Sequence, residues 1–218
     1  MTLTITIIII AITCIISFMA FSNQRLIDDF IFYPPAITQR QQWYRFITCG
    51  FIHADIMHLA FNMISLYMFG QIVEKMFDRF LFPGYGKTMF ILFYLSALAI
   101  SLLPTYSQHK DNYYYRSLGA SGATSAVVFA GIFLFPTEEI GIFIIPPIIP
   151  GFIFAPLFLF ISARLEKRGD DNINHSAHIW GSVYGIVFLI ISCTFFSTYK
   201  PLQSFINQVV RYFQDLFK

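Results

Sequence analysis

Long apolar runs alternate with short polar segments along this chain, and the runs are long enough to predict helices that cross a membrane. A helix needs roughly 20 residues to cross a bilayer core of about 30 Å. The predicted spans cover residues 2–21, 49–73, 88–103, 119–135, 151–163 and 176–196. The predicted fold is therefore all-α: a polytopic membrane domain of six transmembrane helices over residues 1–198.

Two segments outside the spans have an amphipathic pattern. Residues 22–47 mix charges with aromatic residues and prolines, which favours an interfacial loop at the membrane surface. Residues 199–218 predict an amphipathic tail with Phe205, Val209 and Phe213 on one side. The segments 104–118, 136–150 and 164–174 are predicted to be loops.

Composition supports a membrane protein and narrows the partners. Hydrophobic residues make up 56% of the chain and charged residues 12%, against about 25% charged in soluble domains. A net charge of +2 without a basic tract predicts no nucleic-acid partner. Three widely separated cysteines give neither a disulfide framework nor a metal spacing.

The candidate chemistry begins in the small-residue cluster Gly119–Ala123. Its serine, Ser121, is predicted to lie in the first turn of a helix, with nothing bulky beside its hydroxyl. A helix N-terminus offers free N–H groups and a partial positive charge, which would stabilise an oxyanion.

Polar side chains inside predicted spans are candidates for function because they are costly in a membrane. His58 and Asn62 are four residues apart and share one helix face, whereas His53 falls on another face. The spacing of the two histidines differs from that of a helical zinc pair. Two hydrogen-bonded structural histidines are the alternative interpretation.

Two stripes of small residues predict close helix contact. Gly181 and Gly185 form a GxxxG face in the last span, and the fourth span carries Gly122, Ala126 and Ala130 at matching spacing. If the stripes meet, the neighbouring Ser121 and His178 come within hydrogen-bond reach, and a histidine base is what a serine nucleophile needs. Packing alone is the alternative.

Together these motifs resemble the rhomboid family of intramembrane serine proteases. The resemblance rests on Gly119-Ala-Ser121-Gly122, on Ala177-His178-x-x-Gly181-x-x-x-Gly185 and on His53-x4-His58-x3-Asn62. It extends from Tyr44-Arg45 through Gly70-x-x-x-Glu74 to Gly185, and leaves the first span and the tail unmatched.

The resemblance implies a role for each residue. Ser121 would be the nucleophile and His178 the general base, without an acidic third member. His58, Asn62 and the backbone N–H of Ser121 would form an oxyanion hole, with Gly119 in the supporting turn. The remaining matched residues would be structural supports: His53, Arg45, Glu74, Gly181 and Gly185. No metal and no cofactor is implied.

The implied activity is a serine endopeptidase that cuts other proteins in or near their transmembrane segments, inside the lipid bilayer. The rival interpretation is a catalytically inactive relative that binds transmembrane helices. A transporter is a third class, but neither an inverted repeat nor paired charges at mid-membrane are visible. The sequence does not determine the oligomeric state.

The sequence departs from the family pattern near the base. Some rhomboids carry an aromatic residue four positions after the nucleophile, where this chain has Ser125. His175 adds a second histidine near the site and is interpreted as a loop residue, with a group that accepts protons as the alternative. The phenylalanine-rich fifth span is either a lateral gate for substrates or a lipid-facing surface.

Orientation depends on the resemblance. Lys and Arg number six on the side of the termini and eight on the other, so charge bias does not put the termini in the cytoplasm. The family topology does so, and it implies a bacterial inner-membrane protein whose site opens toward the exterior.

Overall fold

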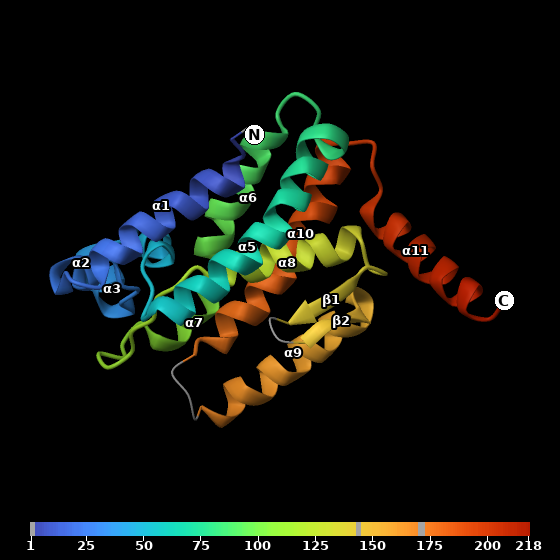
Figure 1. The fold of residues 1–218 in the computed structure, drawn as a ribbon. Coiled ribbons are helices and arrows are strands. Elements are labelled where there is room, and N and C mark those ends of the chain that lie inside the picture. Colours follow the sequence, from blue (N-terminus) through green and yellow to red (C-terminus); the bar gives the residue numbers. More distant parts are fainter. Residues whose placement is uncertain (1–2, 143–144, 170–172) are drawn as a thin grey trace.

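The computed structural model describes residues 3–142, 145–169 and 173–218, which are mostly helical (Figure 1). The elements in chain order are α1 (Ile5–Ala20), α2 (Gln24–Phe30), α3 (Pro34–Arg40), α4 (Arg45–Thr48), a 3-10 turn (Cys49–Phe51), α5 (Ile56–Met76) with a π-helical extension (Phe77–Leu81), α6 (Gly86–Ile100), α7 (Leu103–His109), α8 (Ser121–Leu134), β1 (Glu139–Ile142), β2 (Ile145–Pro150), α9 (Gly151–Arg168), α10 (His175–Phe196) and α11 (Pro201–Leu216).

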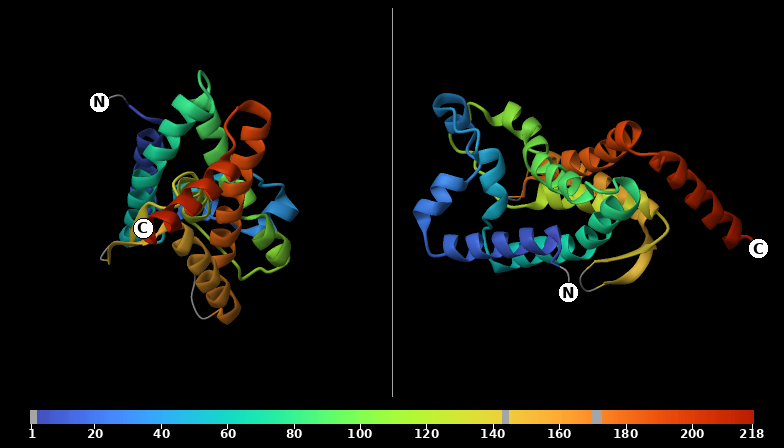
Figure 2. Two further views of the ribbon diagram at one scale, coloured as in Figure 1. Left: turned by 90° about the vertical axis from the view of Figure 1, so that its right-hand side faces the viewer. Right: turned by 90° about the horizontal axis from the view of Figure 1, so that it is seen from above.

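Helix α8 lies at the centre of the bundle and contacts α5, α6, α9, α10 and α11. Nearly all of its residues are buried, and several are glycine or alanine, so neighbouring helices can approach its backbone. The two further views in Figure 2 show the other helices arranged around it, with α11 extending away from the bundle. Ser121, the first residue of α8, is partly buried at the start of this central helix.

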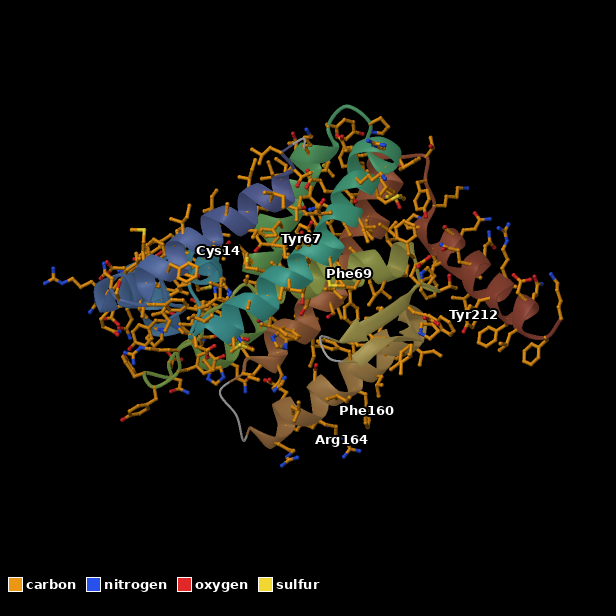
Figure 3. The ribbon with its side chains drawn as sticks, in the orientation of Figure 1. Cys14, Tyr67, Phe69, Phe160, Arg164 and Tyr212 are labelled. Carbon is orange, nitrogen blue, oxygen red and sulfur yellow. The ribbon has the colours of Figure 1, made fainter. Side chains whose placement is uncertain are left out.

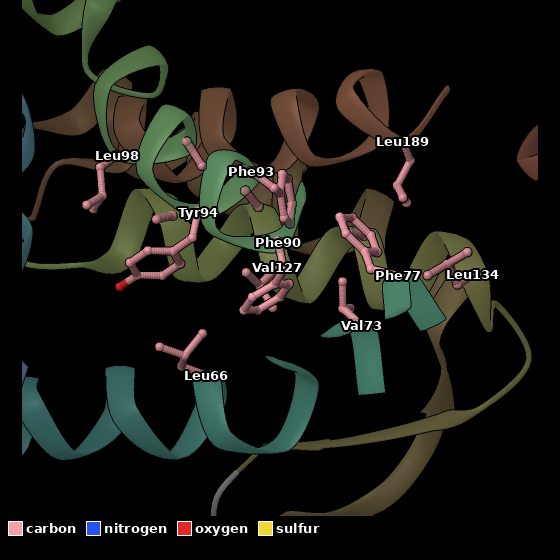
Figure 4. Close-up of a cluster of buried hydrophobic side chains, with 14 of the residues drawn as sticks. Leu66, Val73, Phe77, Phe90, Phe93, Tyr94, Leu98, Val127, Leu134 and Leu189 are labelled. Carbon is pink, nitrogen blue, oxygen red and sulfur yellow. The ribbon is translucent and has the colours of Figure 1, made fainter. Parts of the chain in front are cut away.

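Aromatic side chains fill the space between α5, α6, α8 and α10 (Figure 4). Phe77, Phe90 and Phe93 are fully buried, and Phe77 and Phe93 both contact the ring of Phe188 on α10. Ring pairs of this kind add geometric preference to burial. This core fixes α8 and α10 relative to α5 and α6.

Among the described residues, three helical segments are long and apolar enough to cross a membrane: Ile56–Leu81, Gly86–His109 and His175–Phe196. Helices α1 and α8 are apolar but shorter. Together with the composition, these segments describe an integral membrane protein built of helices.

Several element boundaries differ from those expected. Helix α5 begins at Ile56 and not at residue 49, because the Asp55 carboxylate accepts the backbone N–H of His58 and caps the helix there. Helix α9 continues past residue 163 to Arg168, where Gly169 adopts the left-handed conformation that ends helices. The interfacial segment 22–47 contains α2, α3 and the start of α4.

Two predicted loops contain regular structure. Helix α7 occupies the start of the 104–118 segment, with a proline in its first turn, where the missing N–H costs nothing. Within the segment 136–150, strands β1 and β2 pair antiparallel, because isoleucines favour extended backbone and prolines oppose a helix. Both strands lie beside α9 (Figure 1).

Candidate active site

The two small-residue stripes meet where α8 crosses α10. A Cβ atom added at Gly181 would lie 2.1 Å from the carbonyl oxygen of Gly122, and one at Gly185 would lie 2.2 Å from that of Ala126. Both distances are far below any allowed contact, so the two backbones touch and only glycine fits on α10. A Cβ at Gly122 would lie 3.4 Å from the carbonyl oxygen of Ala177.

This contact brings the segments that carry Ser121 and His178 together. Ser121 directly precedes Gly122, His178 directly follows Ala177, and both belong to the first turns of their helices. Ser121 and Ala177 also line one small cavity of about 10 Å³, together with polar side chains of Ser101, Ser117 and Asn174. A cavity of that size accommodates about one water molecule.

The turn that leads into Ser121 is fixed by hydrogen bonds on both sides. Ser117 exchanges two backbone hydrogen bonds with Phe32, at 2.9 and 3.1 Å, and the N–H of Gly119 donates to the carbonyl of Cys49 at 2.9 Å. Gly119 has a φ of +114°, a conformation that side chains rarely adopt. The start of α8 is thus oriented by the interfacial segment.

His53 connects this turn to α1. Its Nε2 accepts the N–H of Ala120 at 3.3 Å, so Nδ1 carries the ring proton and donates to Ser17 Oγ at 3.0 Å. The Ser17 hydroxyl in turn donates to the carbonyl of Phe51. His53 precedes the spanning helix, and burial lowers its pKa to about 3, which keeps the ring neutral.

His58 lies against the same turn from the side of α5. A Cβ at Gly119 would lie 2.8 Å from His58 Nε2, so this ring occupies the space that a side chain at position 119 would take. Asn62 is buried one helical turn further along, and its amide donates to the carbonyl of His58 at 3.0 Å. That bond uses one of the two N–H donors of the amide.

Two rings, one from α9 and one from α10, lie near His178. The Phe158 ring of α9 lies 6.4 Å from the imidazole, centroid to centroid, at an angle of 31°. His175 lies 5.7 Å away, edge to face. His175 is the first residue of α10 and is buried, so the interpretation of this residue as part of a loop is wrong.

Arg45 and Glu74 lie away from Ser121, in contacts between segments. The buried Arg45 donates to the carbonyls of Asp28 and Ile31 and so binds the interfacial segment. The buried Glu74 carboxylate accepts two backbone N–H groups at the start of α1 and the hydroxyl of Thr6. Neither contact involves Ser121 or His178.

The sequence analysis missed three polar residues that the structure brings to the site: Ser101, Ser117 and Asn174. Asn174 caps α10, since its side-chain oxygen accepts the N–H of Ala177 at 3.0 Å and the hydroxyl of Thr105 at 3.2 Å. An asparagine directly before an apolar helix is a recognised start signal. No sequence pattern indicated the two serines. Within the described residues, no group of three or more metal-binding side chains lies together.

The geometry describes a class of protein: a helical membrane protein with a serine at a buried helix start, beside a helix that carries a histidine. Comparison with known proteins identifies the family. The model of the Rhomboid domain matches residues 40–195, and the chain belongs to the rhomboid family. The match begins in the interfacial segment and ends with α10.

Individual relatives agree with this assignment. The chain is 32% identical over 148 residues to "Putative rhomboid protease YdcA" of Bacillus subtilis (strain 168), which covers 67% of this chain and 65% of the relative. It is 30% identical over 149 residues to "RHOMBOID-like protein 12, mitochondrial" of Arabidopsis thaliana, covering 65% of this chain and 44% of that one. The matched region thus spans less than two thirds of each of these relatives.

Proposed function

We propose that this protein is an intramembrane serine endopeptidase that hydrolyses peptide bonds in or near transmembrane segments of other membrane proteins. The observation that carries the proposal is the backbone contact between Gly122 and Gly181, which joins the turns that bear Ser121 and His178. Membership of the rhomboid family and the cavity beside Ser121 support it.

In the proposed reaction, His178 takes the proton of the Ser121 hydroxyl as the serine oxygen attacks the substrate carbonyl carbon. His178 then gives this proton to the leaving amine, and an acyl-enzyme remains. A water molecule, deprotonated by His178, attacks the ester carbonyl and releases the second product. The serine recovers its proton from the imidazolium, so the enzyme is unchanged.

The tetrahedral intermediates carry a negative oxygen, and three groups near the start of α8 are suited to stabilise it. We assign this role to the Ser121 N–H at the helix N-terminus, to His58 beside Gly119, and to Asn62. Each such donor contributes about 10²–10³ in turnover in serine proteases. The tight fit of Gly119 against His58 supports the assignment.

The proposal includes a membrane arrangement. We propose that α1, α8 and α9 complete six spans with α5, α6–α7 and α10, and that both termini lie in the cytoplasm. The substrates would be transmembrane helices of small-residue or helix-weakening sequence near the cut, because helical carbonyls are hydrogen-bonded and shielded. Bacterial inner membrane is the proposed location.

The test is labelling with a fluorophosphonate probe in detergent or liposomes. Wild-type protein is compared with Ser121→Ala and His178→Ala, and with Ser125→Ala as a matched control one turn further along α8. We expect labelling of the wild type and of Ser125→Ala only. A folded wild-type protein that does not react would instead favour the helix-binding function, and labelling that survives Ser121→Ala would identify another nucleophile.

A further inference from the structure

The imidazole of the proposed base is bordered by an aromatic ring from a different helix than that of the nucleophile. Phe158 on α9 lies 6.4 Å from the His178 ring at 31°, within the range of offset ring contacts. On α8, the residue one turn after Ser121 is Ser125, which has no ring to offer. The aromatic ring beside the proposed base therefore comes from α9.

Phe158 is itself held from two sides. Its ring contacts Phe129 of α8, with centroids 5.5 Å apart, and stacks on Phe154 of its own helix at 5.9 Å. Phe129 is fully buried in the bundle, so its position is fixed. Phe158 thus fills the space between a rigid residue of α8 and the imidazole on α10.

We propose that Phe158 is a positioning residue, whose ring holds the His178 imidazole in the orientation that accepts the Ser121 proton. The base then works only while α9 is packed against α10. This inference rests on the proposed serine protease function. Imidazole rotates readily about its side-chain bonds, and a flat ring on one side restricts that rotation.

The contact would also couple two events. If substrates enter beside α9, the displacement of α9 removes Phe158 from His178 and leaves the base disordered. Proton transfer then resumes when α9 returns with the substrate in place. The active arrangement would form after entry, as in enzymes in which closure completes the site.

The chain offers a matched control on the same helix. Phe160 is two residues from Phe158, but it is 57% exposed, and the guanidinium of Arg164 lies 5.1 Å from its ring centre. Figure 3 shows both side chains on the outer side of α9. Phe160→Leu therefore makes the same chemical change without touching the base.

The experiment compares wild type, Phe158→Leu, Phe158→Tyr and Phe160→Leu in detergent. The first readout is the rate constant of fluorophosphonate labelling, which needs the serine and its base but no transmembrane substrate. The second is the separation of kcat from KM with a transmembrane substrate in liposomes. Thermal unfolding and gel filtration establish that each variant is folded.

We expect Phe158→Leu to lower the labelling rate and kcat about tenfold, with KM within twofold of wild type. Phe158→Tyr keeps the ring and should restore both, and Phe160→Leu should match wild type. Phe158→Leu at the wild-type labelling rate, or with a change in KM alone, overturns the inference and leaves the proposed function intact. Absence of labelling in folded wild type counts against the proposed function itself. If Phe158→Leu does not fold, a slow, folded Phe158→Tyr overturns the inference, because a retained ring should suffice.

Discussion

Helix α10 is contacted on one side by α8 and on another by α9. The first contact is made by backbone atoms and the second by side chains. Against α8, glycine lets backbone touch backbone, and no side chain intervenes at Gly181 or Gly185. Against α9, the contact includes the Phe158 ring beside His178 and a hydrogen bond from the N–H of Ser176 to the exposed carboxylate of Glu166, at 2.8 Å. Aromatic and exposed contacts can separate and re-form, whereas interlocked backbones cannot.

The difference suggests how the proposed protease can be ordered around Ser121 and His178 and still admit a substrate. The groups proposed to react belong to the rigid pair, α8 and α10. The helix proposed to admit substrate, α9, belongs to the pair α9 and α10, whose contacts can separate. The first turn of α9 is held by rings of α11, where Phe152 contacts Tyr212 and Phe213. One face of α10 therefore provides stability through α8, and another face, toward α9, would allow substrate access.

Gly185→Ala should have the largest effect on stability, because it disrupts the backbone contact between α8 and α10. Alanine normally favours a helix over glycine, but here its Cβ would meet the Ala126 carbonyl oxygen at 2.2 Å. We expect the free energy of unfolding to fall by about 3 kcal/mol, as in strong overpacking. Reversible unfolding in mixed micelles measures it, with Val187→Leu on the exposed side of α10 as control. A stabilised Gly185→Ala would show that the helices separate easily.

Asn174→Ala removes the cap that α10 receives from its own chain. The lost acceptor leaves the Ala177 N–H and the Thr105 hydroxyl without their partner, so we expect a loss of about 1 kcal/mol in unfolding free energy. Asn174→Asp keeps the acceptor and should lose much less. Equal losses in the two variants would contradict a capping role.

The double substitution Tyr212→Ala and Phe213→Ala tests the α11 end of α9. The ring of Phe152 would lose two neighbours, and we expect hydrogen–deuterium exchange in the first turns of α9 to rise about threefold, since local openings there become easier. Exchange in α8 should not change. Ile206→Ala, on the exposed side of α11, is the control, and faster exchange throughout the bundle would argue against a local contact.

Glu166→Ala should have the smallest effect on stability. The carboxylate is exposed, and exposed charge contacts contribute little, so the unfolding midpoint should stay within error of wild type. Exchange at the end of α9 should rise about twofold. Glu166→Gln retains an acceptor oxygen for the Ser176 N–H and should resemble wild type. A clear drop in stability would place α9 in the rigid part of the molecule.

Much of the arrangement around Ser121 could be predicted because it depends on residue size at helical spacing. Stripes of glycine and alanine predict where two helix backbones approach each other, and the backbones do touch at Gly122 and Gly181. The polar contacts of the site could not be predicted. Ser101 and Ser117 reach the cavity through the crossing of α6 with α8 and through the pairing with Phe32, and no local pattern encodes either.

Helix ends were harder to predict than helix faces. The start of α5 depends on one carboxylate, that of Asp55, inside a run that was predicted as one continuous span. Strands β1 and β2 were missed because prolines within a short apolar run favour a loop over a strand. The role of Phe158 beside His178 required the three-dimensional packing of α9, since nothing in the sequence distinguishes it from Phe154 or Phe160.

The Glu74 cap has a consequence for the order in which the protein is made. Glu74 follows Thr6 by 68 residues, and at about 5–20 residues per second the ribosome needs several seconds to synthesise that stretch. During this interval the first turn of α1 has its N–H groups but not the carboxylate that will accept them. We therefore expect the N–H groups of Ile5 and Thr6 to lack their final acceptor until the part of α5 that carries Glu74 has been made.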